Sequence, residues 1–203
     1  MKEYVVFVSS PSDTKEERCV ITEIIDEINW YYEPVEEIPR LKLLDLENNV
    51  RSKITGLEPQ AIIDEQIKGY DVFIGIFRNK FGTPTEKYGS GTEQEFYNAW
   101  EKYNENPDSV EISFYFCSKL PSDKKEVNIE DLMAINKFKE KIGNEGFYKE
   151  YDSIKKFKEI IRADLRNFVL EKRFFASGDD LEDKIDGRIG NFANELANQI
   201  RKS

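Results

Sequence analysis

The segment that decides the fold is GYDVFIGIFRNKFGTPTEKYGSGTEQEFYNAW, residues 69–100. Its apolar run at 72–77 is too short for a helix and rich in β-forming residues, as expected for a strand covered on both faces. A glycine-rich loop follows, and from Phe96 onward apolar residues recur at helical spacing. The segment therefore predicts a strand, a loop and a helix. In open α/β sheets such a loop lies beyond the carboxyl end of a strand, where these folds bind ligands.

Strand and helix patterns alternate along the rest of the chain. The predicted strands besides 72–77 are residues 4–8, 41–46, 110–117 and 146–151. Asp13, with Glu16 three residues later, resembles a capping box at the start of the first helix, and Ser153 is the expected cap of the last helix of the domain. We predict a flavodoxin-like three-layer α/β sandwich, with a central five-stranded, mostly parallel sheet and helices on both faces.

The chain divides into a domain and an extension. Residues 1–172 carry the alternating pattern, and a break containing Ser177 and Gly178 follows. Beyond it, apolar residues recur at threes and fours on an otherwise polar segment. Residues 173–203 are therefore predicted to be a C-terminal amphipathic helical extension, which either docks on the domain or pairs with a partner helix.

Composition excludes several classes of function. The net charge of -10 argues against direct nucleic-acid binding, which needs clustered Lys and Arg. The chain has no histidine, which removes Ser-His-Asp and Cys-His machinery and His-ligated metals. Cys19 and Cys117 lack the spacing of a zinc site or a disulfide framework, so both are expected to be core thiols, and no metal site is expected. Without a leader or membrane-spanning stretch, the expected location is cytoplasmic and away from membranes.

Several short motifs occur in a recognisable order. VFVSS at 6–10, DVFIGI at 71–76, Phe81-Gly82 and GTEQEF at 91–96 together resemble the bacterial TIR-like (Toll/interleukin-1 receptor-like) domains of antiphage defence and STAND-type signalling proteins. The resemblance covers roughly residues 3–170 and implies NAD⁺ hydrolysis with release of nicotinamide, NAD⁺ being a substrate and no cofactor being needed. Glu95 matches the glutamate that carries this activity in the wider TIR family. The resemblance also implies an effector of antiviral defence that self-associates, through the loop near residues 47–58.

Glu95 also has a purely structural interpretation. Thr92-x-x-Glu95 has the form of a capping box, in which the glutamate reaches back to the threonine amide. The long glycine-rich loop ahead of it is more than a cap requires, and Glu93 adds a second carboxylate beside the expected ligand site. Catalysis and capping both remain open for Glu95.

Other residues near the ends of the strands are candidates for binding the substrate. Ser9 and Ser10 end the first strand and offer hydroxyl and amide groups, while Arg78 follows the central strand and, like Lys80, could meet phosphate. Phe81 could stack on a ring, as could Tyr88. Each also has an ordinary interpretation, as a turn residue, a solvated charge or a packed ring.

Two other functions fit the same sequence. Many TIR domains only self-associate, so the chain could be a non-catalytic assembly or signalling module that acts through a partner protein or a fused sensor domain. A nucleoside deoxyribosyltransferase-like enzyme is a further alternative, because its related fold also places a glutamate against a ribosyl carbon.

Overall fold

The apolar run in the middle of the sequence forms the central strand of a sheet. In the computed structural model, which describes residues 2–44, 69–121, 128–143 and 148–172, strand β3 (Val72–Phe77) has all of its residues buried. Its side chains alternate between two apolar layers, because successive residues of a strand point to opposite faces. Val72, Ile74 and Ile76 enter one layer, and Phe73 and Phe77 enter the other.

The sheet has the strand order β2-β1-β3-β4-β5. The other strands are β1 (Glu3–Ser9), β2 (Arg40–Leu44), β4 (Glu111–Cys117) and β5 (Tyr148–Tyr151). Every pairing among these strands is parallel. This order and direction confirm the predicted flavodoxin-like α/β fold.

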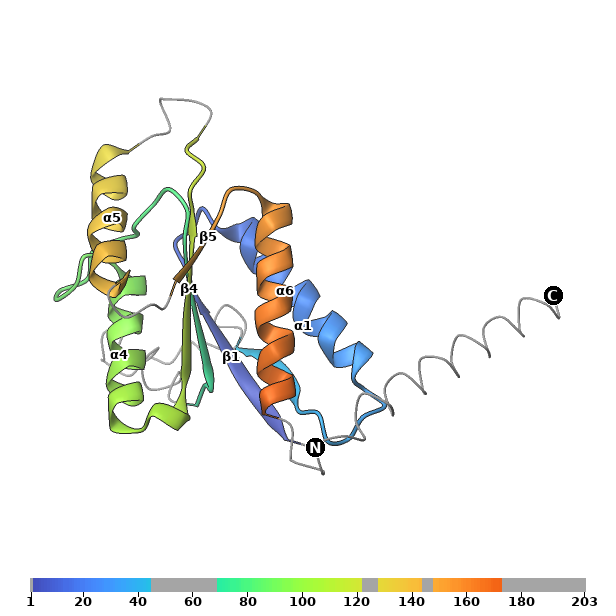
Figure 1. Ribbon diagram of the computed structural model, residues 1–203. Coiled ribbons are helices and arrows are strands. Elements are labelled where there is room, and N and C mark those ends of the chain that lie inside the picture. Colours follow the sequence, from blue (N-terminus) through green and yellow to red (C-terminus); the bar gives the residue numbers. More distant parts are fainter. Residues whose placement is uncertain (1, 45–68, 122–127, 144–147, 173–203) are drawn as a thin grey trace, which may run out of the picture.

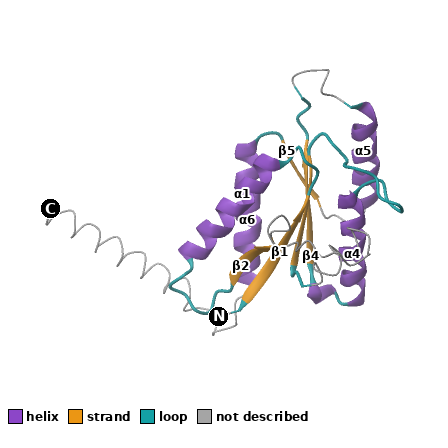
Figure 2. Cartoon of the chain, turned by 180° about the vertical axis from the view of Figure 1, so that it is seen from behind, coloured by secondary structure: helices purple, strands orange, loops and turns teal. Residues whose placement is uncertain are grey.

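Helices cover both faces of the sheet (Figure 1). Helices α1 (Lys15–Tyr31) and α6 (Ile154–Glu171) pack together on one face, and α4 (Gly91–Glu105) and α5 (Ile129–Gly143) lie on the other, as the view from behind also shows (Figure 2). A short 3-10 helix, η1 (Pro107–Ser109), leads from α4 into β4. The three predicted layers are therefore present.

After each of the two central strands the chain turns toward a different face of the sheet. From β1 the chain passes to α1 on one face, and from β3 it passes to α4 on the other face. The carboxyl ends of β1 and β3, which are neighbours in the sheet, therefore form a topological switch point. Loops that leave such neighbouring strands diverge and leave a crevice between them.

Gly75 lets an aromatic core form beside the central strand. A Cβ atom at this position would lie 2.1 Å from Cε1 of Phe114, its neighbour on β4. The Phe114 ring occupies that space and contacts several other rings of the layer, among them those of Phe73, Phe96 and Phe138. The side-chain-free position thus allows close packing between β3 and β4.

Two details of α1 differ from the predictions. The capping box at Asp13 is wrong: the N-cap of α1 is Thr14, which makes no side-chain capping bond. The Asp13 carboxylate is instead bonded to a loop on the other side of the switch point, as described below. Cys19 is exposed rather than a core thiol, because it lies off the face of α1 that carries Val20 and Ile24.

The predicted cap of α6 is confirmed, since the Ser153 hydroxyl accepts a hydrogen bond from the Lys156 amide at 3.3 Å.

Two predictions lie outside the described residues. These are the assembly loop at 47–58 and the C-terminal helical extension at 173–203.

Candidate functional site

A cleft of about 670 Å³ opens at the switch point. It is lined by the loop after β1 (residues 10–12), by residues of the loop after β3 between Lys80 and Thr85, by the first turns of α4, and by Asp131 of α5. The cleft is therefore lined by the loops that follow both central strands and by the helix layer that contains α4. This is where a fold of this kind binds its ligands.

The cap of α4 lies two residues earlier than the sequence suggested. Ser90 is the N-cap, and its hydroxyl accepts a hydrogen bond from the Glu93 amide at 3.1 Å. The Glu93 carboxylate reaches back and accepts from the Gly89 amide at 2.8 Å. Ser90 and Glu93 thus perform the reciprocal capping that had been assigned to Thr92 and Glu95, and that assignment is wrong.

Glu95 faces the cleft, where a residue of the first strand holds it. Ser9, the last residue of β1 and only 2% exposed, donates a hydrogen bond from its hydroxyl to the Glu95 carboxylate at 2.5 Å. Glu95 itself is half-buried and lines the cleft. A bond from a buried hydroxyl on a central strand fixes the carboxylate more firmly than a surface contact would, because the strand has little freedom to move. The structure thus brings together Glu95, the predicted catalytic residue, and Ser9, one of the residues predicted to bind the substrate.

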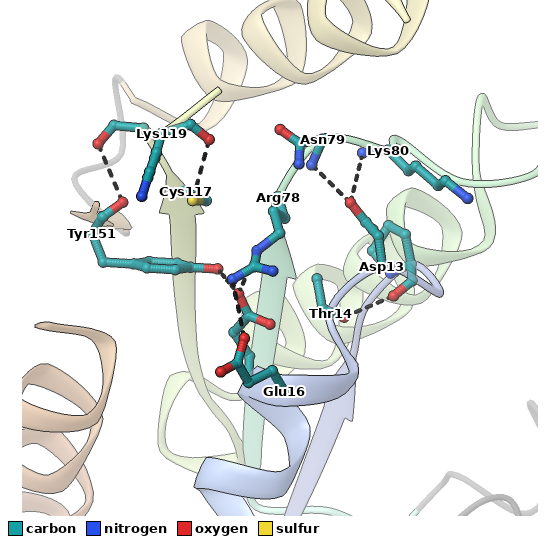
Figure 3. A network of polar contacts seen from close by, with 12 residues as sticks. Asp13, Thr14, Glu16, Arg78, Asn79, Lys80, Cys117, Lys119 and Tyr151 are labelled. Atoms are coloured by element: carbon teal, nitrogen blue, oxygen red, sulfur yellow. Dashed lines mark hydrogen bonds and ion pairs between the residues drawn. The ribbon is translucent and has the colours of Figure 1, made fainter. Parts of the chain in front are cut away.

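Two carboxylates brace the loop that follows β3. Asp13, just before α1, accepts from the amides of Asn79 and Lys80 at 2.9 and 3.2 Å (Figure 3). Asp131, near the start of α5, accepts from the next amide, that of Phe81, at 2.9 Å. Three successive backbone donors thus have charged partners, and the wall of the cleft is held from both sides of the sheet.

The turn after the braced segment requires glycine. Gly82 has a φ of +108°, a conformation that side chains rarely adopt, and a Cβ atom there would lie 3.1 Å from Cβ of Ser90. Gly82 lines the cleft, so the turn brings backbone close to any bound ligand.

Arg78 points away from this cleft. Its Nε donates to Oε1 of Glu17 at 2.9 Å, and its Nη2 lies 3.6 Å from Oε2 of Glu16, both on α1. Figure 3 shows the guanidinium turned toward Glu16 and Tyr151, whereas Asn79 and Lys80 lie farther along the loop, beside Asp13. Arg78 lines a separate, smaller hollow of about 340 Å³. The structure therefore does not bring Arg78 together with Glu95.

The partner of Arg78 is an unusual buried carboxylate. Glu17 is 0% exposed, and its Oε1 also accepts a hydrogen bond from the Tyr151 hydroxyl at 2.7 Å. Within the described residues its Oε2 has no hydrogen-bond partner. Burial opposes the charge on Arg78 and is the largest single influence on it, but Glu17, Glu16 and the other negative groups nearby together outweigh burial and hold the guanidinium pKa above its ordinary value.

The groups around this ion pair stay protonated. Burial, reinforced by the hydrogen bond to Glu17, raises the pKa of Tyr151. Burial also raises the pKa of the Cys117 thiol, which is half-buried beside Arg78. A protonated thiol is a poor nucleophile, so this network serves to join α1, β3 and β5 rather than to react.

The remaining candidates lie in different surroundings. Ser10 lines the cleft, as does Lys80. Phe81 is 7% exposed and stacks on Phe77 within the aromatic core, with ring centroids 5.4 Å apart. Tyr88 stacks on Tyr97 and is not part of the cleft lining.

Sequence analysis missed two contributors to the site. Asp131 lies on α5, which follows β4 and the loop after it, so only the folded structure reveals that its carboxylate accepts from the Phe81 amide. Thr92 was interpreted as a cap, but it is 6% exposed and lines the cleft. The sequence did carry a signal for Thr92, because Ser90-x-x-Glu93 is an equally good capping box two residues earlier.

A larger hollow of about 710 Å³ lies at the opposite edge of the sheet, around Asp71 and Glu111. These residues stand at the amino ends of β3 and β4. Folds of this type bind ligands at the carboxyl ends of the strands, so the smaller cleft at Glu95 is the better candidate.

Comparison with protein families identifies the chain. The profile of the family described as "Domain of unknown function (DUF4062)" matches residues 5–166. The chain belongs to the DUF4062 family. The matched range contains both partners of the hydrogen bond between Ser9 and Glu95, and also Asp13 and Asp131. A comparison with curated proteins gives no match. The described part of this DUF4062 chain has no helix long and apolar enough to cross a membrane, and no cluster of three or more His, Cys, Asp or Glu side chains that could hold a metal ion.

Proposed function

We propose that the chain is a TIR-like domain that hydrolyses NAD⁺ at the cleft beside Glu95. One observation carries the proposal. Glu95 is not needed to cap α4, yet its carboxylate is held by a buried hydroxyl in the cleft at the switch point. A carboxylate oriented at a ligand-binding crevice suits a reaction in which positive charge develops on a sugar.

The reaction breaks the bond between the pyridine nitrogen of nicotinamide and the anomeric carbon of its ribose. The bonding electron pair leaves with nicotinamide and neutralises its positive charge, so the leaving group needs no general acid. Water adds to the anomeric carbon and releases one proton, which gives ADP-ribose. Because nicotinamide leaves without protonation, a chain without histidine can carry out this chemistry.

Each residue of the pair has a defined part in this reaction. Glu95 faces the anomeric carbon and stabilises the oxocarbenium-like transition state by its charge. Ser9 orients the carboxylate by donating to it, and being buried it is shielded from competing water. The braced loop from Asn79 to Phe81 keeps the opposite wall in place.

The biological setting proposed here follows from the resemblance to TIR-like proteins. In that setting the domain is a cytoplasmic effector of antiviral defence, activated when copies of it assemble. The activity per protomer should then rise with protein concentration, because assembly follows mass action.

The experiment compares two neighbouring glutamates. Glu95→Gln keeps the size of the side chain but removes the charge, and we expect NAD⁺ cleavage to fall at least about a hundredfold, equivalent to about 3 kcal/mol in the barrier, with the melting temperature unchanged. Glu93→Gln is the matched control, because glutamine can still accept from the Gly89 amide and keep the cap. Nicotinamide release is followed by chromatography over a range of protein concentrations.

Two outcomes would contradict the proposal. One is wild-type cleavage by the Glu95→Gln variant. The other is the absence of NAD⁺ cleavage by the unaltered protein at every concentration. Deoxynucleosides tested under the same conditions show whether the site instead transfers deoxyribosyl groups, and inactivity toward both substrates favours an assembly module.

A further inference from the structure

Among the described residues, the first turn of α4 has one backbone donor without a partner. The first bond of the helix runs from the Gln94 amide to the Ser90 carbonyl at 3.1 Å, so the amides of residues 91–93 need acceptors elsewhere. Two of them have one: Gly91 donates to the Thr83 carbonyl at 3.2 Å, and Glu93 donates to the Ser90 hydroxyl at 3.1 Å. The amide that remains is that of Thr92, a residue that lines the cleft.

Two hydroxyls of the cleft have no hydrogen-bond partner among the described residues. Thr92 is 6% exposed as a residue, and its hydroxyl keeps some contact with the cleft. Ser10 lines the same cleft, and its hydroxyl oxygen is fully buried. A buried hydroxyl normally has a partner, so the Ser10 hydroxyl, together with the open Thr92 hydroxyl beside a helix amino end, indicates a polar ligand.

The charge of this part of the cleft favours an anion. Lys80 lines the cleft, is exposed and forms no ion pair within the described residues. The amino end of a helix carries partial positive charge, and Glu93, the acidic residue in the first turn, is engaged with Gly89. A Cβ atom added to Gly91 would have no neighbour within 4 Å, so the approach to the helix end is open.

We propose that the amino end of α4 is a phosphate subsite, formed by the amide and hydroxyl of Thr92, the Ser10 hydroxyl and the Lys80 ammonium. The substrate is then a 5′-phosphorylated N-riboside rather than a free nucleoside. The identity of the sugar rests on the proposed function, whereas the phosphate subsite does not.

The position of Glu95 agrees with a cleft in which the phosphate binds at the amino end of α4 and the sugar binds beside Glu95. Thr92 and Glu95 are three residues apart, so they share a face of α4 and are separated by about 4.5 Å along its axis. This separation suits a ribose whose anomeric carbon faces Glu95 and whose 5′-phosphate reaches the helix end. Among the described residues the cleft lining contains two carboxylates, of which Glu95 accepts from the Ser9 hydroxyl and Asp131 from the Phe81 amide.

The test measures binding without turnover. Ribose 5-phosphate and ribose have no glycosidic bond to cleave, and their binding to the unaltered protein is followed by NMR titration. We expect ribose 5-phosphate to bind at least about tenfold more tightly, since hydrogen bonds to a charged group exceed those to a neutral one. The preference should weaken as salt is added, because the Lys80 ammonium is exposed.

Variants identify the groups responsible. Thr92→Val keeps the shape of the side chain but removes its hydroxyl, and Lys80→Gln removes the ammonium; each should reduce the preference at least about fivefold, while Thr92→Ser retains it. Lys87→Gln is the matched control, because Lys87 is an exposed lysine of the same loop that does not line the cleft. Melting temperatures of all variants report on folding.

The outcomes separate this inference from the proposed function. Equal binding of the two sugars, no binding of ribose 5-phosphate, or a preference that survives both Thr92→Val and Lys80→Gln overturns the subsite, whether or not NAD⁺ is cleaved. A preference that depends on Thr92 and Lys80 in a protein that does not cleave NAD⁺ supports the subsite and contradicts the proposed hydrolysis.

Discussion

The buried ion pair between Arg78 and Glu17 gives a prediction that can be scaled from the structure. Arg78→Met removes the charged partner of a carboxylate that is 0% exposed and has one oxygen without a hydrogen-bond partner in the part of the chain that the structure describes. Leaving a buried charge unpaired costs about 3 to 5 kcal/mol. For a chain of 203 residues, at about 2 to 4 °C per kcal/mol, the melting temperature should fall by about 6 to 20 °C.

An exposed ion pair of the same chemistry is the control. Arg162 donates two hydrogen bonds to Glu27, at 2.8 and 2.9 Å, between α6 and α1. Its side chain is 37% exposed and that of Glu27 is 48% exposed, so Arg162→Met should cost no more than about 1 kcal/mol. Thermal unfolding followed by circular dichroism compares the two variants under identical conditions.

The double variant Glu17→Leu with Arg78→Met tests the reason for the difference. Replacing both charges by apolar side chains removes the unpaired carboxylate, so much of the lost stability should return. If Arg78→Met were no more destabilising than Arg162→Met, the reasoning would be refuted. Glu17 would then not depend on Arg78, and the guanidinium would be available to a ligand, as the sequence first suggested.

Three further predictions concern packing, pH and catalysis. Gly75→Ala should cost about 3 kcal/mol in urea unfolding, because its Cβ would overlap the Phe114 ring; a near-neutral effect would contradict this packing. Partial desolvation beside the larger hollow raises the pKa of Glu111, although the residue is exposed, so its ionisation destabilises the fold as the pH rises above the usual glutamate range. Glu111→Gln should therefore raise the melting temperature slightly at neutral pH and not near pH 4, and an equal gain at both pH values would contradict this reasoning. Ser9→Ala should lower kcat for NAD⁺ about tenfold with KM little changed, and an unchanged kcat would show that Ser9 does not position Glu95.

The fold was predictable because its strongest signals are local. The apolar run at 72–77 is a buried strand, and the alternation of strands and helices allows few arrangements besides a parallel sheet. The exposure of Cys19 could also have been predicted from the sequence. The inner face of α1 runs through Glu17, Val20 and Ile24, and Cys19 lies off that face.

The partners of charged side chains were not predictable. Asp13 matches the capping pattern, but it bonds to amides 66 and 67 residues away, because β1 and β3 become neighbours only in the folded sheet. Arg78 follows the central strand, as a phosphate ligand would, yet it is turned toward a carboxylate on α1. Local patterns report helix ends and strand faces, whereas these contacts depend on which elements the topology brings together.

The bracing of the loop after β3 constrains its length. Amides 79 and 80 bond to Asp13 beside α1, and amide 81 bonds to Asp131 on α5. Inserting or deleting one residue here would shift every donor away from its acceptor. Further along the same loop, Glu86 and Lys87 are exposed, so added residues at that tip would leave the bracing contacts unchanged. Proteins built on this framework can therefore change what enters the cleft by lengthening or shortening the tip, while the segment next to the central strand keeps its length.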